Sequence, residues 1–374
     1  MKDALAEQLL GTVLGWQPSD VAKERPILQA MASLKYDEYQ QFSPGLRFLE
    51  SLALWLNQFD PDDREIAYRF LKASLIFCSN EEMNHLVETA YQDHIRPILL
   101  STSAVEQSIN ARHVGRIAIS VPFRMLQRQT LFLGLSDGAR IDTFRRANNQ
   151  DLNHEQIWQT HELSKERVDE LLEKLAAHVA DINGKPPAAA TFRSIVLLDD
   201  FSASGSSYYA RKDDGTAGGK VAKFLRALAD DGSPLHRLCD PGGVDVTILI
   251  YMATDQAIVH LRDALKGSIA GVRQTYVETV QSVPGRIKVA RGDTAVQFTK
   301  LVEKYYNATV DKAVFDVHMK KGKTPDARYG YADCGLPVIL HHNTPNNALG
   351  ILWFYENCGI RGLFPRVQRH REMA

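Results

Sequence analysis

The most constraining feature of the sequence is a short apolar segment that runs directly into two acidic residues. The apolar residues 195–198 are followed at once by Asp199 and Asp200. A continuous apolar run of this length is typical of a parallel strand that is buried on both faces. Because side chains alternate along a strand, the two carboxylates should contact different neighbours. We therefore expect an acid pair at the carboxyl end of a strand, where open parallel sheets bind their ligands.

A loop of small residues follows the acid pair. After Phe201, residues 202–207 read Ser-Ala-Ser-Gly-Ser-Ser. Such small side chains let the backbone approach a ligand closely, and its amides can then surround an anion. Two acids beside an anion-sized loop predict a site for a phosphorylated sugar, with the ribose hydroxyls on the acids and the 5′-phosphate in the loop.

Residues 195–207 resemble the phosphoribosyl-diphosphate (PRPP) motif of type I phosphoribosyltransferases, in which four apolar residues and two acids precede a small hydroxyl-rich loop. The resemblance implies a parallel sheet, PRPP as donor, Mg²⁺ as cofactor, and displacement of pyrophosphate from the anomeric carbon. It assigns the ribose 2′- and 3′-hydroxyls to Asp199 and Asp200, which would hold the metal indirectly, through those hydroxyls or through water. The 5′-phosphate would lie among the residues of the loop: Ser202, Ala203, Ser204, Gly205, Ser206 and Ser207.

The sequence departs from the pattern of that family at two places. Phe201 and Ser202 stand where small aliphatic residues are usual, and residues 208–219 separate the loop from the next predicted helix. These departures keep open a second hypothesis, a non-catalytic protein that senses PRPP or another nucleotide. The overall arrangement is also similar to phosphoribosyltransferase-like effectors of bacterial conflict systems, which implies a role in antiviral defence.

A second small loop follows the predicted strand 129–135 and is followed by Arg140. In the resembled family, the strand before the PRPP strand carries a loop that binds pyrophosphate. The resemblance therefore implies that Arg140 stabilises the leaving diphosphate, together with the backbone amides of four residues: Ser136, Asp137, Gly138 and Ala139.

The same segment supports a third hypothesis, a serine hydrolase. Residues 134–138 spell Gly-x-Ser-x-Gly after a strand, a pattern typical of a nucleophilic serine in a sharp turn. Ser136 would be the nucleophile, and His341 or His342 would be the base. This hypothesis leaves the acid-pair strand unexplained.

The chain alternates between predicted strands and helices from residue 116 onward, which favours a parallel α/β sheet. Strands are predicted at 116–121, 129–135, 194–198, 244–252, 272–277 and 336–340. Helices are predicted at 167–180, 220–229, 255–266, 294–306 and 347–357. Before this alternation, we predict a helical N-terminal region over residues 1–115, which could bind a protein partner. A phosphoribosyltransferase-like α/β domain with a C-terminal extension should follow over residues 116–374.

Composition limits the possible partners. The formal net charge is −1, so no overall field attracts the chain to nucleic acid or to an anionic membrane. Basic patches at 318–323 and 361–371 leave local nucleic-acid binding open, and Phe364 lies among the arginines of the second patch. The four cysteines show no metal-binding spacing, and the N-terminus has no signal-peptide pattern, so we expect reduced thiols in a cytoplasmic protein without membrane spans.

Overall fold

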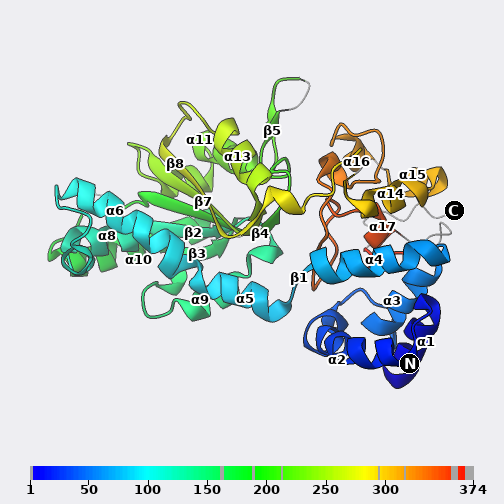
Figure 1. Ribbon diagram of the computed structural model, residues 1–374. Coiled ribbons are helices and arrows are strands. Elements are labelled where there is room, and N and C mark those ends of the chain that lie inside the picture. The colour runs from blue at the N-terminus through cyan, green and yellow to red at the C-terminus, as the bar shows by residue number, and fades with distance from the viewer. Residues whose placement is uncertain are drawn as a thin grey trace. The chain divides into compact units, whose positions relative to one another are not determined.

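The structure is a computed structural model that describes residues 3–160, 164–187, 190–211, 214–293, 295–315, 317–354 and 361–366. The chain forms two compact units (Figure 1). One unit runs from Met83 to Pro284, and the other combines residues 1–82 with residues 285–374. The sequence placed a single boundary at residue 115, whereas the structure divides the chain at two other points. The reason is that the segment after residue 82 contacts the sheet, while both chain ends share one core.

The continuous unit contains a five-stranded sheet in the order β3-β2-β4-β7-β8, in which every neighbouring pair is parallel. Its strands are β2 (Thr130–Gly134), β3 (Ile157–Gln159), β4 (Ser194–Ser202), β7 (Val244–Thr254) and β8 (Val272–Val283). All of β2 and the first six residues of β4 are buried, as their continuous apolar runs predict. The predicted α/β class with a parallel sheet is confirmed.

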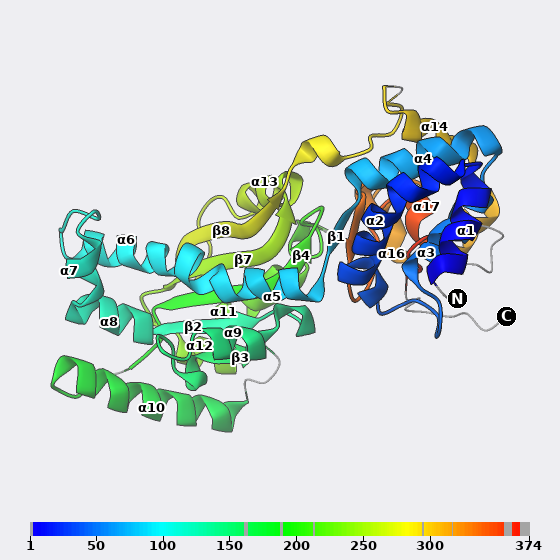
Figure 2. The same cartoon turned by 60° about the horizontal axis from the view of Figure 1, so that its bottom comes forward.

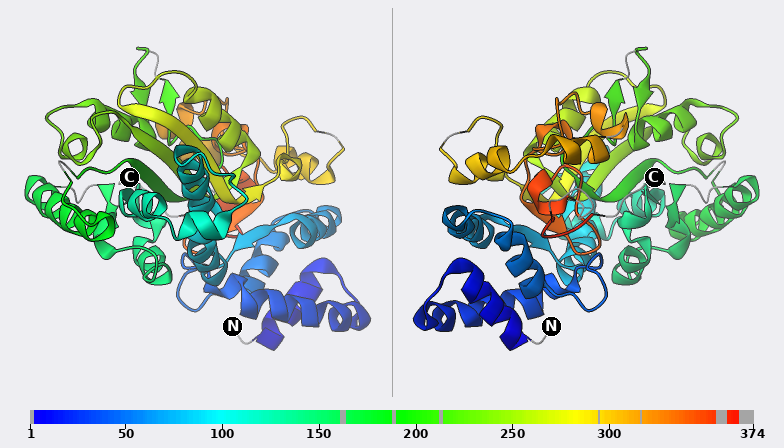
Figure 3. Two further views of the ribbon diagram at one scale, coloured as in Figure 1. Left: turned by 90° about the vertical axis from the view of Figure 1, so that its left-hand side faces the viewer. Right: turned by 90° about the vertical axis from the view of Figure 1, so that its right-hand side faces the viewer.

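Helices cover both faces of this sheet (Figures 2 and 3). One face is covered by α10 (Lys165–Asn183), α11 (Lys220–Ala229), α12 (Pro234–Leu238) and α13 (Asp255–Ala264). These helices bury apolar side chains against strand residues such as Leu131 and Ile195. On the other face, Phe132 contacts Tyr91 and Phe144, which come from the π-helical turn Ala90–Ile95 and from α9 (Ile141–Ala147). The strand ends that carry the predicted site are therefore held in a packed core.

One predicted strand, residues 116–121, is wrong. Helices α7 (Val114–Ala118) and α8 (Val121–Arg128) occupy this segment and follow α5 (Asn80–Thr89) and α6 (Arg96–Glu106). The hydroxyl of Ser120 accepts a hydrogen bond from the Phe123 amide at 3.3 Å, and a proline stands in the first turn of α8. These are strong helix-start signals, and they outweigh the strand propensity of the neighbouring isoleucine and valine residues.

The other unit has an apolar core to which both chain ends contribute. Its helices are α1 (Asp3–Leu14), α2 (Pro18–Leu34), α3 (Phe48–Asn57), α4 (Pro61–Ser74), α14 (Gln297–Lys304), α15 (Ala308–Val314), α16 (Val317–Lys320) and α17 (Gly350–Trp353). The indole of Trp55 donates to the carbonyl of Ile351 at 2.9 Å, so α3 is tied to α17. Strand β9 (Val338–Leu340) pairs in parallel with β1 (Ile76–Cys78) in a separate sheet. The predicted last strand therefore lies outside the main sheet.

Two expectations concern the chain as a whole. Among the described residues, Cys78, Cys239 and Cys334 are buried and belong to no disulfide, and Cys358 lies outside the described residues. In the described part of the chain, no helix is both long and apolar enough to cross a membrane.

Candidate functional site

The two predicted loops lie side by side at the carboxyl edge of the main sheet. β2 and β4 are parallel neighbours, and Gly134 is in register with Leu198. The amide of Leu135 donates to the carbonyl of Leu198 at 2.9 Å, so the pairing continues up to the start of both loops. The structure therefore brings the segment 136–140 next to the acid pair.

Asp199 is fully buried, and its carboxylate contacts side chains of two other segments. Its carboxylate accepts a hydrogen bond from the hydroxyl of Ser136 and forms an ion pair with the ammonium group of Lys220. A buried carboxylate requires such compensation, because loss of hydration is costly for a charge. Asp199 is therefore directed into the protein, where it connects β4 with the loop after β2 and with the start of α11.

Asp200 is only partly buried and sits against the loop after β2. Its carboxylate accepts a hydrogen bond from the Phe201 amide at 2.8 Å. Gly138 packs so closely that a Cβ atom there would lie 2.5 Å from Cγ of Asp200. Burial and the neighbouring charge of Asp199 raise the pKa of Asp200 to about 6, and Lys220 limits the increase. A carboxyl with such a perturbed pKa at a strand end is typical of functional sites.

The loop 202–207 is anchored at both ends and keeps a buried hydroxyl unused. The hydroxyl of Thr254 donates to the carbonyl of Ala203, and the amide of Tyr208 donates to the carbonyl of Gly205 at 3.0 Å. Gly205 has a φ of +78°, and a Cβ atom there would lie 2.7 Å from the ring of His260. Ser202 is 2% exposed, and its hydroxyl has no hydrogen-bond partner in the part of the chain that the structure describes.

Two further serines of this loop contact each other. The hydroxyls of Ser204 and Ser206 share a hydrogen bond of 2.8 Å. Like the hydroxyl of Ser202, they are groups that can bind phosphate oxygens. The loop thus has the chemistry of an anion site.

The insertion 208–219 separates the loop from the next helix by a small hairpin. Among its described residues, β5 (Ala210–Arg211) pairs in an antiparallel manner with β6 (Ala217–Gly218). Helix α11 begins directly after the hairpin, but its first amides are already used: those of Lys220 and Val221 donate to the carbonyls of Ser207 and Tyr208. The first amides of α11 are therefore bonded to the backbone of Ser207 and Tyr208.

The loop after β2 forms a 3-10 turn, Asp137–Ala139, that is held by a hydrogen bond from β7. The hydroxyl of Tyr251 donates to the carbonyl of Ala139 at 2.7 Å. Arg140 has a φ of +46°, and its Nη1 donates to Oδ1 of Asn84 in α5 at 2.6 Å. Asn84 therefore orients the guanidinium group of Arg140.

Ser136 does not have the surroundings of a catalytic serine. Its hydroxyl donates to Asp199, a carboxylate that is already paired with Lys220. A nucleophilic serine needs a base such as histidine as the acceptor of its proton. His341 and His342, which the sequence offered for this role, follow β9 in the other unit.

A cavity of about 330 Å³ adjoins Lys220. Its walls are mainly apolar and come from Leu135, Phe224, Ala227, Pro234 and Leu235, with Thr160, Lys223 and Ser233 as further lining residues. A volume of this size is at the lower end of what small-molecule sites occupy.

The described residues of the second predicted basic patch, 361–366, include a buried aromatic ring. Phe364 is fully buried and stacks on Phe48, at a centroid distance of 5.9 Å, inside the core of its unit. Arg366 lies over the ring of Trp353, and Arg369 and Arg371 lie outside the described residues. The expectation that Phe364 could stack a base is therefore wrong. In the first patch, Lys320, Lys321 and Lys323 are exposed.

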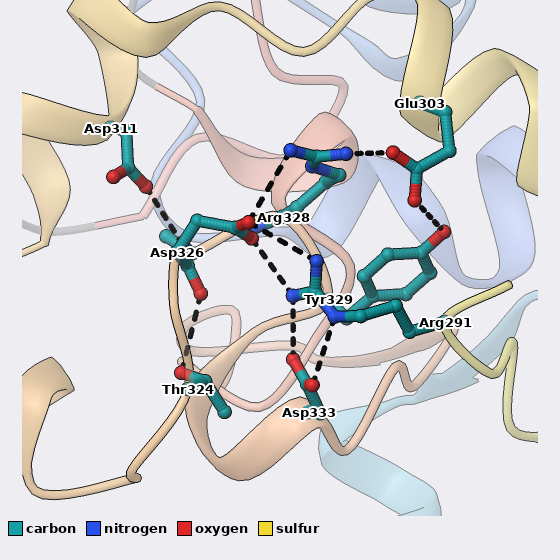
Figure 4. A network of polar contacts seen from close by, with 9 residues as sticks. Arg291, Glu303, Asp311, Thr324, Asp326, Arg328, Tyr329 and Asp333 are labelled. Carbon is teal, nitrogen blue, oxygen red and sulfur yellow. Dashed lines mark hydrogen bonds and ion pairs between the residues drawn. The ribbon is translucent and has the colours of Figure 1, made fainter.

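A network of charges in the unit formed by both chain ends is a second polar centre (Figure 4). Arg291 donates to both carboxylate oxygens of Asp333 and to both of Asp326. These hydrogen bonds raise the pKa of Arg291, and those to Asp333 contribute the most. Arg328 pairs with Asp326 and with Glu303, and Glu303 also accepts a bond from Tyr329 at 2.6 Å. Because both arginines are paired with carboxylates, the network cross-links the segment 326–333 to α14.

Comparison with known proteins agrees with this arrangement. The sequence matches the family model of PRTase-CE over residues 52–366, which include the acid pair and both loops. The chain therefore belongs to the PRTase-CE family, whose members are phosphoribosyltransferase-like. No curated protein and no solved structure matches the chain significantly.

Lys220 is a residue of this site that the sequence did not reveal, and for Gly138 the sequence did not reveal the contact with Asp200. Lys220 lies 21 positions after Asp199 and follows the insertion 208–219. The sequence of this insertion does not predict that the chain returns to the acid pair after it. Gly138 was assigned to the diphosphate through its amide, but its contact with Asp200 depends on the pairing of β2 with β4.

Proposed function

We propose that this protein binds PRPP, or a related ribose-5-phosphate nucleotide, at the carboxyl edge of β2 and β4. As an enzyme it would transfer the phosphoribosyl group to an acceptor and release pyrophosphate. The observation that carries the proposal is the contact between the two loops: the acid pair lies directly between an anion-type loop at 202–207 and the turn at 136–139. A ligand with a phosphate at each end of a ribose matches this order of groups.

The structure favours different roles for the two acids. Asp199 is fully buried and bonded to Ser136 and Lys220, so we assign it the positioning of the site. Asp200 keeps contact with solvent, so we assign it the ribose hydroxyls. The unused hydroxyl of Ser202 and the serines after it would bind the 5′-phosphate.

Mg²⁺ fits this proposal as an ion held mainly by the ligand. Mg²⁺ prefers oxygen ligands and is usually bound by one or two carboxylates together with substrate phosphates. Among the described residues, no group of three or more histidine, cysteine or acidic side chains could hold a metal by itself. Asp200 would therefore hold the ion indirectly, through the ribose hydroxyls or water. The chemistry that the ion supplies when bound is neutralisation of the diphosphate charge.

The residues of the chain would act mainly by position and charge. As the bond from the anomeric carbon to the diphosphate breaks, positive charge develops on the ribose and negative charge on the leaving group. Asp200 lies on the side of the ribose, and the amides of the turn 136–139 with Arg140 lie on the side of the diphosphate. Donors fixed before the reaction stabilise such charges without reorganisation, and this is commonly a large contribution to catalysis.

A binding protein without turnover is the second candidate function. The observation that favours it is the ion pair between Lys220 and Asp199, which occupies one of the two acids. Such a protein would use the same loops to sense PRPP. The role in antiviral defence and the helical partner surface stay predictions.

Release of pyrophosphate tests the proposal. The wild type and Asp200→Asn are incubated with MgCl₂ and PRPP labelled in its β-phosphate, with nucleobases or cell extract as the source of acceptor. We expect labelled pyrophosphate from the wild type and none above background from Asp200→Asn. Binding of PRPP without release by the wild type would support the sensor instead. Absence of both binding and release would refute the proposal.

A further inference from the structure

Lys220 is linked to both loops of the candidate site, to one directly and to the other through Asp199. Its ammonium group pairs with Asp199, whose carboxylate also accepts the hydroxyl of Ser136 in the loop after β2. Its backbone amide donates to the carbonyl of Ser207, the last residue of the loop after β4, at 3.0 Å. One residue therefore connects the segment 136–140 with the segment 202–207.

The two ends of the insertion 208–219 contact each other, which places Lys220 next to the loop 202–207. Gly219 has a φ of +102°, a conformation that favours glycine, and a Cβ atom there would lie 2.5 Å from the carbonyl carbon of Tyr208. The amide of Val221 donates to the carbonyl of Tyr208 at 2.9 Å. The two ends of the insertion thus meet, and Lys220 lies 5.3 Å above the ring of the fully buried Tyr208. Lys220 is placed beside the acid pair because the hairpin closes on itself.

The contact of Lys220 with Asp199 is not an ordinary surface ion pair. Asp199 is 0% exposed, and Lys220 is 35% exposed. Surface pairs contribute little because water competes for both partners, but water cannot reach this carboxylate. Without the ammonium group, Asp199 would keep Ser136 as its hydrogen-bond donor but would lose its counter-ion. The carboxylate would then have to move, and Ser136 would move with it.

We propose that Lys220 is a positioning residue that holds the two loops of the site in the arrangement that binds the ligand. Its side chain acts on the loop 136–140 through Asp199, and its backbone fixes the end of the loop 202–207. The identity of the ligand rests on the proposed function above, whereas the ordering of the loops does not. Loops that are ordered before binding lower the entropic cost of binding.

Hydrogen exchange of the protein without ligand tests the ordering directly. Lys220→Met is compared with the wild type, with Lys220→Arg and with Lys223→Met, a matched control because Lys223 is an exposed lysine three residues further along α11. We expect amides of the segments 135–140 and 202–208 to exchange roughly tenfold faster in Lys220→Met, because the local opening free energy falls by about 1.4 kcal/mol. Exchange should stay near the wild-type rate in Lys220→Arg and in Lys223→Met.

Two results would overturn the proposal in this experiment. One is wild-type exchange of both loops in Lys220→Met, and the other is an equal increase across the whole unit, which would indicate a purely global loss of stability. If Lys220→Met does not fold, Lys220→Gln replaces it, because glutamine keeps a hydrogen-bond donor but carries no charge.

Binding of PRPP with MgCl₂ supplies the second measurement, as a double-mutant cycle of Lys220→Met and Asp199→Asn. If Lys220 acts through Asp199, the double variant binds no more weakly than the weaker single variant. Additive losses would mean that Lys220 contacts the ligand directly, and this outcome contradicts the proposal. If the wild type itself does not bind PRPP, the proposed function fails, while the exchange experiment still decides the role of Lys220.

Discussion

The adjacent acids should respond to the same substitution with opposite changes in stability. Asp199→Asn removes a charge that Lys220 and Ser136 compensate, so it should lower the free energy of unfolding. Asp200→Asn removes a charge that burial and Asp199 disfavour, so it should raise the free energy of unfolding above pH 6. Asparagine can still accept the hydrogen bond from the Phe201 amide, so the local geometry is retained.

The magnitude for Asp200 follows from its pKa, which rises from 3.8 to about 6 on folding. Each unit of difference between the folded and unfolded pKa corresponds to about 1.36 kcal/mol, so the change in the free energy of unfolding has an upper limit of about 3 kcal/mol. The side chain keeps some contact with solvent, so we expect a gain of about 1 to 2 kcal/mol. The size of this gain depends on pH: well above pH 6 the group is charged in both states and the full penalty is present. As the pH falls below 6 the folded group takes up a proton and the penalty decreases, and it is gone well below pH 3.8, where the group is protonated in both states.

Urea unfolding at pH 8 and at pH 4 measures this difference. Asp200→Asn should be more stable than the wild type at pH 8, and most of this difference should be lost at pH 4. Asp199→Asn should be less stable than the wild type at pH 8 by about 1 to 3 kcal/mol. The substitution leaves Lys220 without its carboxylate, but Lys220 is partly exposed, so water can replace part of the lost interaction. A loss of stability at pH 8 in Asp200→Asn, or a gain that does not change with pH, would refute the reasoning about this acid.

Three further predictions concern other positions. Gly138→Ala places a methyl group against the Asp200 carboxylate and should weaken PRPP binding roughly tenfold in calorimetry, since overpacking costs about 1–3 kcal/mol, whereas Gly115→Ala, with open space around it, should bind normally. Phe364→Ala should lower the free energy of unfolding by about 3–5 kcal/mol in urea, because a fully buried ring leaves a cavity, and a change below 1 kcal/mol would contradict its place in the core. The wild type should not react with a fluorophosphonate, because Ser136 donates to a carboxylate, and labelling that is lost in Ser136→Ala would restore the hydrolase hypothesis.

The centre of the site could be predicted from the sequence because its signals are local. The apolar run at 195–198 leads into an acid pair and a small-residue loop, and all of these features lie within 13 consecutive residues. The structure has β4 at this position, with parallel neighbours on both sides. A strand that is buried on both faces cannot show alternation, so continuity of apolar residues was the correct signal.

The remaining features depend on contacts between distant parts of the chain. Lys220 reaches Asp199 only because Gly219, at the end of the insertion, packs against Tyr208 at its start, and the residue types of the insertion do not predict this contact. The shared core of both chain ends joins residues about 300 positions apart, such as Trp55 and Ile351, so the boundary at 115 could not be corrected from local patterns. Phe364 shows the same limit, since an aromatic residue among arginines has the same sequence pattern whether it is buried or exposed.

Isothermal titration of PRPP with MgCl₂ tests the central claim most directly. The wild type and Asp200→Asn are titrated at pH 8, where the variant should be the more stable protein, so that lost binding cannot be attributed to unfolding. The account predicts saturable binding by the wild type and no measurable heat with Asp200→Asn. Equal binding by both proteins, or no binding by the wild type, would contradict the assignment of this sheet edge as a phosphoribosyl site.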